Sequence, residues 1–300
     1  MVMIVSMGGL IFGYDTGQIS GFLEMHDFLE RFADSTDSMT GEPAFSNVRS
    51  GTIVGLLSIG TLIGAIVGAP IANAAGRKLA IVFWCIVFIV GVIVQISTAT
   101  HWYQIVIGRW VAGLGVGGLS VLTPMYQSET APRQIRGAMV SCYQLFITAG
   151  ICKFFPLRLA IPPCQDYIAN NLVTVLAYCI NFGTHGGRYT NSPDSWRIPM
   201  GIGFIFPVIM AVGIMFLRES PRWEYRKGRI ESSRTTIAKS YGVPENHWEV
   251  EREMREIKAK LDAENAGGGK HHWYEVFTGP RMMYRTLLGI SMQALQQLTG

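Results

Sequence analysis

The stretch YQIVIGRWVAGLGVGGLSVLTPM, residues Tyr103–Met125, decides the fold class of this chain. It exceeds the ~20 mostly apolar residues that a helix needs to cross a bilayer, and Arg109 is its one charged residue. The stretch therefore predicts a transmembrane helix. Gly113, Gly115 and Gly118 within it also satisfy the dinucleotide-binding pattern G-x-G-x-x-G. No strand precedes these glycines, so we reject a nucleotide site.

Further apolar stretches flank this one on both sides. They cover 2–22, 51–72, 79–99, 138–183 with an interruption at about 152–175, and 198–217, while 282–300 begins a seventh span that stays short of membrane length. The whole composition agrees, because 49% hydrophobic and 15% charged residues do not suit a soluble surface. We therefore predict an all-α, multi-pass membrane protein with the lipid bilayer around residues 1–217.

The distribution of Lys and Arg between the spans predicts the orientation. Residues 24–50 hold two basic and six acidic side chains, whereas 218–281 hold 13 of the chain's 25 basic residues. Positive charge is retained on the cytoplasmic side of a membrane. The first loop is therefore expected outside, and the amino terminus in the cytoplasm. Region 218–281 is expected to be a cytoplasmic helical linker, and the membrane to be the plasma membrane.

Small residues four positions apart indicate where membrane helices pack. Gly60, Gly64 and Gly68 have this spacing on the second span, and Gly113 and Gly117 have it on the fourth. Residues without a bulky side chain let two helix backbones approach closely. We expect these glycines to form packing seams.

Two ionisable residues lie inside predicted spans, Asp15 in the first and Arg109 in the fourth. At ~1.5 Å per residue, both lie about 10 Å below the outer surface, so they are expected to pair. Two readings stay open. The pair serves proton-coupled transport, or it only locks two helices together.

Amide and hydroxyl side chains follow a helical repeat on two spans: Ser141, Gln144 and Thr148 on the fifth, and Gln293, Gln296 and Gln297 on the seventh. Such groups both donate and accept hydrogen bonds, as sugar hydroxyls do. The aromatic faces of Phe12 and Tyr14 would suit a pyranose ring. The alternative is hydrogen bonding between helices, which membrane proteins also use.

Other classes of site find little support. We see no nucleophile and base at plausible spacing, no cluster of metal ligands and no cofactor motif, so an enzyme or metal protein is not expected. The net charge of +4 is weak, and the basic residues form no stripe, so nucleic acid is not an expected partner.

Six motifs together resemble the sugar porter family of the major facilitator superfamily, close to the fungal hexose transporters. They are GGLIFGYDTGQISG (Gly8–Gly21), AAGRK (Ala74–Lys78), GRWVAGLGVGGLSVLTPMYQSETAPRQIRG (Gly108–Gly137), CYQLFITAGI, RESPRW (Arg218–Trp223) and QQLTG (Gln296–Gly300). Two positions depart from the family pattern. Asn73 stands where the second-loop motif usually has an acidic residue, which puts the charge latch of that loop in question, and Arg218 replaces the usual proline.

The resemblance implies roles for particular residues. It places seven side chains at or near a sugar site: Phe12, Thr16, Gln144, Ile147, Ile151, Gln296 and Gln297. It matches Asp15 and Arg109 to a pair linked to proton coupling in symporters, without deciding between symport and facilitated diffusion. It also assigns a cytoplasmic charge network to Arg77, Glu129, Arg136, Glu219 and Arg222.

The resemblance further implies the amino-terminal six-helix half of a major facilitator fold. The expected function is transport of a monosaccharide, glucose or another hexose, by alternating access between two such halves. The rival is a sugar sensor of the same fold that signals instead of transporting. Because only the first half and the start of a seventh span are recognised, the chain is expected to be incomplete and not to transport alone.

The interruption at about 152–175 conflicts with a normal fifth span. It would place Lys153, Arg158 and Asp166 at membrane depth, each costing about 2.5 to 3.5 kcal/mol, beside several prolines. Joining 138–151 directly to 176–183 restores one ordinary span. We expect an intron read as coding sequence; an excursion to the outer surface that returns as a half-helix is the alternative. Sequencing the spliced message distinguishes them.

Overall fold

The computed structural model describes residues 2–22, 25–36, 43–98, 101–151, 193–266 and 282–298. It divides into two compact units, residues 1–245 and 246–300. The second unit contributes the helices α13 (Trp248–Ala266) and α15 (Met282–Leu298). The other elements among the described residues belong to the first unit, and the candidate site lies within it.

The described part of the first unit is almost entirely helical, which confirms the all-α class. In chain order its helices are α1 (Val2–Phe22), α2 (His26–Phe32), α3 (Asn47–Ala75), α4 (Arg77–Ile96), α5 (Trp102–Thr130), α6 (Arg136–Ile151), α9 (Asp194–Ile202), α10 (Ile205–Met215), α11 (Pro221–Arg226) and α12 (Ile230–Tyr241). Two short strands, β1 (Ser35–Thr36) and β2 (Pro43–Ala44), pair antiparallel between α2 and α3.

Within the part of the chain that the structure describes, four helical segments are long and apolar enough to cross a membrane: Asn47–Ala75, Arg77–Ile96, Trp102–Thr130 and Ser195–Met215. They coincide with the predicted second, third, fourth and sixth spans, although α3 and α5 extend further at both ends. Helix α1 has the bounds predicted for the first span. The predicted interruption at 152–175 lies outside the described residues, and α6 ends immediately before it.

The sixth span consists of two helices because of a proline. Pro207 has no N–H to donate to the carbonyl of Gly203, and its ring would clash with that carbonyl in a continuous helix. The chain instead makes a tight turn at Gly203 and Phe204, where the Gly203 N–H bonds to Met200 O at 3.1 Å. The carbonyl of Pro199 is thereby released from the helix ladder, and it accepts the Tyr14 hydroxyl at 2.7 Å.

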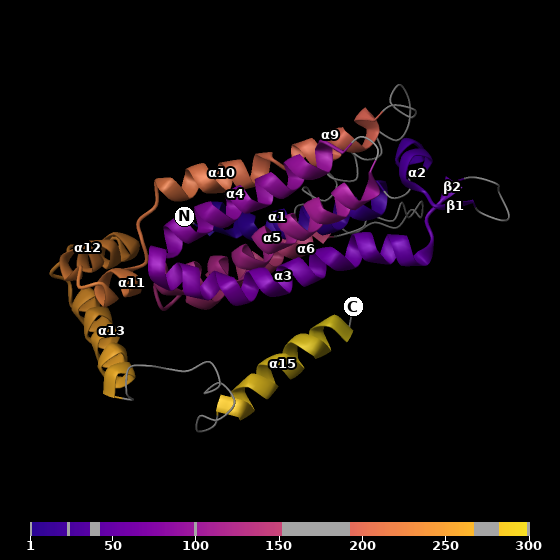
Figure 1. Ribbon diagram of the computed structural model, residues 1–300. Helices are drawn as coiled ribbons and strands as arrows, with labels where there is room; N and C mark the ends of the chain where they lie inside the picture. The colour runs from indigo at the N-terminus through magenta and orange to yellow at the C-terminus, as the bar shows by residue number, and fades with distance from the viewer. Residues whose placement is uncertain are drawn as a thin grey trace, which may run out of the picture. The chain divides into compact units, whose positions relative to one another are not determined.

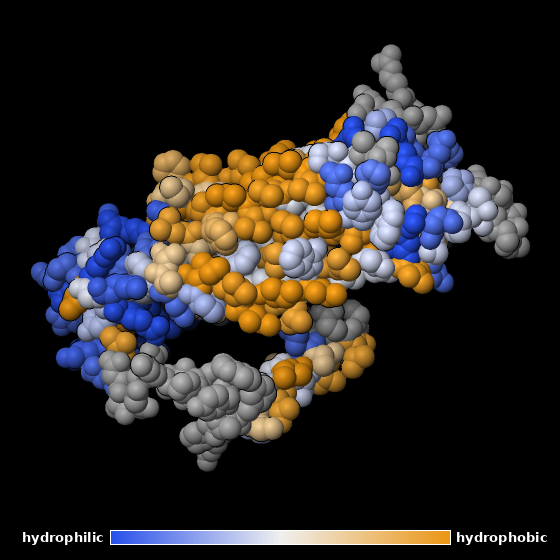
Figure 2. Space-filling view, viewed as in Figure 1, coloured by the Kyte–Doolittle hydropathy of each residue, from blue (hydrophilic) through white to orange (hydrophobic). Residues whose placement is uncertain are grey.

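Helices α3 and α4 pack on α5, while α1 packs on α6, α10 and α5 (Figure 1). Apolar side chains form a band over α3, α4 and α10, between hydrophilic ends formed by α2 with its strands and by α11 with α12 (Figure 2). Leu62, Ile66, Ile86 and Val212 are exposed within this band. An apolar surface of this extent between polar rims is typical of a face that contacts lipid.

The glycine seams predicted from the sequence are confirmed between α3 and α5. A methyl group at Gly64 would lie 2.2 Å from Leu114 O, and one at Gly117 would lie 2.1 Å from Thr61 O. Both distances are far below van der Waals contact, so any side chain would push the helices apart. The rejected nucleotide motif thus serves helix packing, because Gly115 and Gly118 face Phe88 and Trp84 on α4 in the same way.

A polar anchor holds α2 against α9 beside the hydrophilic end that carries the strands. The buried carboxylate of Asp27 accepts Trp196 Nε1 at 3.1 Å and Arg31 Nε at 2.9 Å. Phe28 and Phe32 pack edge-on against the Trp196 ring. This cluster fixes α2 against α9, in a region that the sequence indicates only as a loop.

Candidate functional site

The predicted pair of ionisable residues inside the membrane helices is present. Arg109 on α5 donates from Nη2 to Asp15 Oδ2 on α1 at 3.5 Å, and both side chains are almost fully buried, at 0% and 3% exposed. Gln18, one turn further along α1, also hydrogen-bonds the Asp15 carboxylate. The pair joins helices that are far apart in the chain, as the similar depths of the two residues predicted.

This pair is incompletely satisfied. Asp15 Oδ1 has no hydrogen-bond partner among the described residues, and the 3.5 Å contact from Arg109 Nη2 to Asp15 Oδ2 is at the long limit for a hydrogen bond. A buried carboxylate oxygen without a donor is costly. Such a group is poised to gain a proton, a water or a different partner when its surroundings change.

A second buried ion pair stands at the other end of α5. Arg77, the first residue of α4, donates from Nε and Nη2 to the two oxygens of Glu129 at 2.9 and 3.0 Å. The Ser220 hydroxyl donates to the same carboxylate. Both charged side chains are buried, and the two parallel bonds have the strong bidentate geometry of arginine with carboxylate.

Glu219 ties the loop between α3 and α4 to the segment after α10. Its carboxylate accepts the backbone N–H groups of Arg77 at 3.0 Å and Lys78 at 3.1 Å. Gly76 has φ 101°, and a Cβ there would lie 2.6 Å from Glu219 Oε2, so glycine is required. The loop is therefore held without an acidic residue at Asn73, whose backbone carbonyl accepts Trp223 Nε1 at 3.1 Å.

The other members of the predicted charge network lie differently. Arg136 donates from Nε and Nη2 to the backbone carbonyl of Ala131, at 3.3 and 3.2 Å. Arg222 is half-buried, and its Nε has no hydrogen-bond partner among the described residues. Hydrogen bonds thus join Arg77 to Glu129 and to Glu219, while the network roles of Arg136 and Arg222 stay predictions.

The predicted sugar-site residues are distributed over α1 and α6. Phe12, Thr16 and Ile147 are half-buried, and Gln144 is exposed on α6. The side chains of Ile151, Gln296 and Gln297 lie outside the described set. Tyr14 is buried, with its ring against Phe206 at 5.3 Å and its hydroxyl on α9, so it serves helix packing and presents no open face to a sugar.

Several bonding residues escaped the sequence analysis. Ser220 both caps α11 and donates to Glu129, and Tyr126 donates its hydroxyl to the Arg218 carbonyl. The Ser-Pro pair at 220–221 does signal a helix start, since serine is a common cap and proline suits the first turn. Nothing in the sequence signals that the capping hydroxyl also reaches a carboxylate on α5.

Comparison with known proteins places these features in context. The family model described as "Sugar (and other) transporter" matches residues 1–154 and 170–300. The unmatched residues fall within the predicted interruption at 152–175, whose origin stays a prediction. The chain is 40% identical over 301 residues to the high-affinity fructose transporter ght6 of Schizosaccharomyces pombe, covering 100% of this chain and 51% of the relative. It is 41% identical to the low-affinity glucose transporter HXT1 of Saccharomyces cerevisiae, covering 99% and 47%.

Solved structures agree with this result. The partially occluded, inward-open xylose transporter XylE from E. coli matches with a TM-score of 0.69 at 26% identity, covering 90% of this chain and 59% of the other. The XylE proton:xylose symporter bound to 6-bromo-6-deoxy-D-glucose matches with a TM-score of 0.70 at 25% identity, covering 89% and 54%. The described helices thus have the major facilitator fold, and the chain spans about half the length of the curated relatives.

Proposed function

This chain belongs to the sugar (and other) transporter family, whose matched relatives are membrane transporters and not enzymes, and from that premise we propose that it serves monosaccharide transport by alternating access. Its six-helix unit would form one wall of the sugar path. A hexose is the expected substrate, because the relatives carry glucose or fructose in their names.

One observation carries this proposal. Helix α6 buries Tyr143 on its α1 side and exposes Ser141 and Gln144. An amide and a hydroxyl exposed to lipid would be costly, so this face suits an aqueous path or a second helical unit across it. Phe12 and Thr16 are only half-buried on α1, the helix against which α6 packs.

We predict that Gln144→Ala weakens sugar uptake in a hybrid that joins this chain to the remaining half of the Schizosaccharomyces pombe relative. Losing a buried hydrogen bond to a sugar hydroxyl costs about 1 to 3 kcal/mol, which raises the KM roughly 5- to 150-fold. Uptake of labelled glucose and fructose would be measured in a yeast strain that lacks hexose uptake, at equal surface abundance.

The matched control is Gln104→Ala. The Gln104 amide donates to Val94 O and Ser97 Oγ inside the protein, so its loss should leave the KM unchanged. Gln95 suits this purpose less, because it is 1% exposed and its removal would leave a cavity. An equal rise in KM for both variants would remove the reason for placing Gln144 on the sugar path.

We also propose that Asp15 carries the coupled proton. The support is its burial, its 3.5 Å contact to Arg109 and its Oδ1, which has no donor among the described residues, together with the symporter among the structural neighbours. Asp15→Asn cannot release a proton, so the hybrid should lose accumulation against a gradient yet keep sugar exchange. Accumulation equal to that of the unmodified hybrid would contradict a coupling role and favour facilitated diffusion.

The orientation is a further part of the proposal. The end of the unit that carries α11 and α12 would face the cytoplasm, because basic residues are concentrated in 218–281, and the amino terminus would lie there too. Plasma-membrane vesicles sealed with a known side outward test this arrangement. Protease added outside right-side-out vesicles should spare 221–266, and cleavage there would reverse the assignment.

A further inference from the structure

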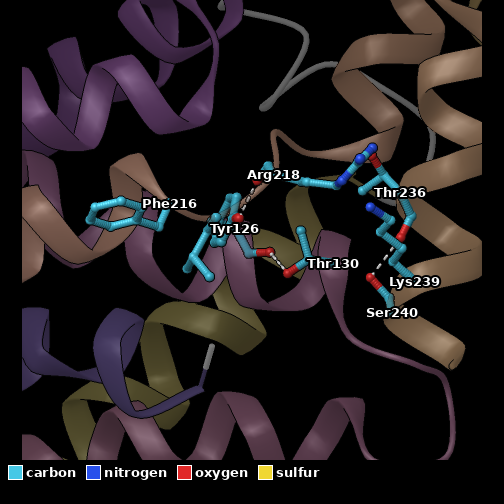
Figure 3. Close-up of a pocket in the computed structure, with 8 residues that line it drawn as sticks. Tyr126, Thr130, Phe216, Arg218, Thr236, Lys239 and Ser240 are labelled. Atoms are coloured by element: carbon cyan, nitrogen blue, oxygen red, sulfur yellow. Dashed lines mark hydrogen bonds between the residues drawn. The ribbon is translucent and has the colours of Figure 1, made fainter.

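A pocket of about 330 Å³ lies between the ends of α5 and α10 and one face of α12. Figure 3 shows Phe216 at one end of the pocket, Tyr126 in the middle and the side chains of Arg218 and Lys239 at the α12 end. The pocket therefore has an apolar end and a cationic end. It belongs to neither the proposed sugar path nor the Asp15 pair.

The pocket sits where the apolar band of the first unit gives way to its hydrophilic end. Phe216 follows the last turn of α10 and is 85% exposed, whereas Arg218, two residues later, is exposed on the polar side. In a bilayer this boundary coincides with the layer of phospholipid headgroups. The two ends of the pocket thus match the two chemistries of a phospholipid at that depth.

Among the described side chains that line the pocket, Arg218 and Lys239 are the cationic hydrogen-bond donors. Its four hydroxyl groups already donate elsewhere: Tyr126 to Arg218 O, Thr130 to Tyr126 O, Thr236 to Glu224 Oε2 and Ser240 to Thr236 O. Arginine and lysine are the residues that bind phosphate through charge-assisted bonds. An anion in the pocket would therefore depend on Arg218 and Lys239.

The neighbouring carboxylates do not cancel this charge by direct contact with the pocket. Glu224 accepts the hydroxyls of Ser232 and Thr236, and Glu219 accepts backbone N–H groups. Neither carboxylate lines the pocket. Both carboxylates keep their charge, but Arg218 and Lys239 are the charged side chains that line the pocket wall and can contact an anion there.

We propose that this pocket binds the headgroup phosphate of an anionic phospholipid. Arg218 and Lys239 contact the phosphate, and Phe216 and Leu217 contact the start of the acyl chains. The same phosphate chemistry occurs in soluble esters, but the exposed apolar end favours the lipid. Arg218 stands where the family motif usually has a proline, so the binding would be a property of this chain and not of the fold.

The test uses the purified full chain in detergent, with lipid binding measured by native mass spectrometry. The probes are phosphatidylinositol, phosphatidylcholine with the same acyl chains, and glycerophosphoinositol as the soluble headgroup. The chain should retain phosphatidylinositol over phosphatidylcholine. Each basic residue near a membrane surface contributes about fivefold in affinity, so R218Q with K239Q should lower phosphatidylinositol binding roughly 25-fold.

The control variant carries K258Q and K260Q, which remove the same charge from exposed positions on α13, outside the pocket. It should bind phosphatidylinositol as the unmodified chain does. Equal losses in both double variants would mean general surface attraction and would overturn the proposal. Glycerophosphoinositol that competes as well as the lipid would also overturn it, because the apolar end would then contribute nothing.

Folding of each variant is checked by far-UV circular dichroism. If the double variant does not fold, the single K239Q, at an exposed position on α12, should still lose about fivefold, and K239R should restore binding. A K239Q variant that binds phosphatidylinositol normally would overturn the proposal. Because no sugar is present, these results are independent of the proposed transport function.

Discussion

Two buried arginine–carboxylate pairs stand on α5, and they differ in how completely they are bonded. Glu129 accepts two short bonds from Arg77 and a third from Ser220. Asp15 accepts a contact of 3.5 Å from Arg109 and a hydrogen bond from Gln18, and its Oδ1 has no donor among the described residues. Both oxygens of Glu129 are bonded in the first pair, whereas Asp15 Oδ1 in the second pair could still accept a hydrogen bond.

The difference follows from where each pair lies. Arg77 and Glu129 stand at helix ends, where a serine from a third segment can reach them. Asp15 and Arg109 stand within helices whose backbone donors are already used, so only side chains can satisfy them. Bonding like that of Arg77 and Glu129 stabilises one conformation of the helices. Bonding like that of Asp15 and Arg109 suits a change of conformation that depends on a proton, as we propose above.

The largest expected effect comes from breaking the saturated pair. Arg77→Met would leave Glu129 buried without its arginine and should lower the free energy of unfolding by about 3 to 5 kcal/mol. Unfolding of the purified chain by sodium dodecyl sulfate in mixed micelles measures this change. Arg252→Met, which removes a 57%-exposed partner of Glu256, should cost under about 1 kcal/mol. Equal costs would refute the contrast between buried and exposed pairs.

A smaller change in unfolding free energy is expected when the two buried pairs are compared with each other. Glu129→Gln removes the charge from an acceptor of three bonds, and Asp15→Asn removes it from an acceptor of the long Arg109 contact and one bond from Gln18. We expect Asp15→Asn to cost at least ~1 kcal/mol less in unfolding free energy, because fewer charge-assisted bonds are lost. The same micelle assay on both variants decides this. A greater loss for Asp15→Asn would mean that its pair is primarily a structural lock.

The smallest effect concerns an exposed pair. Asp34 accepts the Ser46 backbone N–H and hydroxyl and lies 3.6 Å from Arg49, and these contacts hold the pKa of its carboxyl below the ordinary value. A lowered folded-state pKa contributes stability that is complete above the unfolded value of about 4 and is lost as pH falls through the folded value.

The melting temperature of the unmodified chain should therefore exceed that of Asp34→Asn at pH 6, and the difference should shrink as the pH falls below about 4. Thermal scans of both proteins from pH 7 to pH 3 measure it. Asp262→Asn, at an exposed position on α13, serves as the comparison. A difference that is constant over this range would show that the charge of Asp34 does not contribute.

The sequence was sufficient for the four membrane-length helices among the described residues and for the close packing of α3 on α5. Hydropathy predicts the membrane helices because each must bond its own backbone within the bilayer. Spacing alone predicted that Gly64 and Gly117 lie at packing seams, since residues four apart share a helix face, while the structure supplied their partners Leu114 and Thr61. Equal depth predicted that Asp15 and Arg109 pair, and the family motifs identified the fold.

Other features were decided only by the tertiary structure. Hydropathy predicted the sixth span as a single helix, but Pro207 divides it into two helices. The released Pro199 carbonyl accepts the Tyr14 hydroxyl, so Tyr14 is buried in helix packing and presents no open face to a sugar. Arg77 pairs with Glu129, and Glu219 binds the loop backbone, because of how the ends of α3, α5 and α10 meet. The pocket beside Arg218 likewise needs side chains from three segments. Distances between segments remote in the chain depend on packing, and local sequence patterns do not encode them.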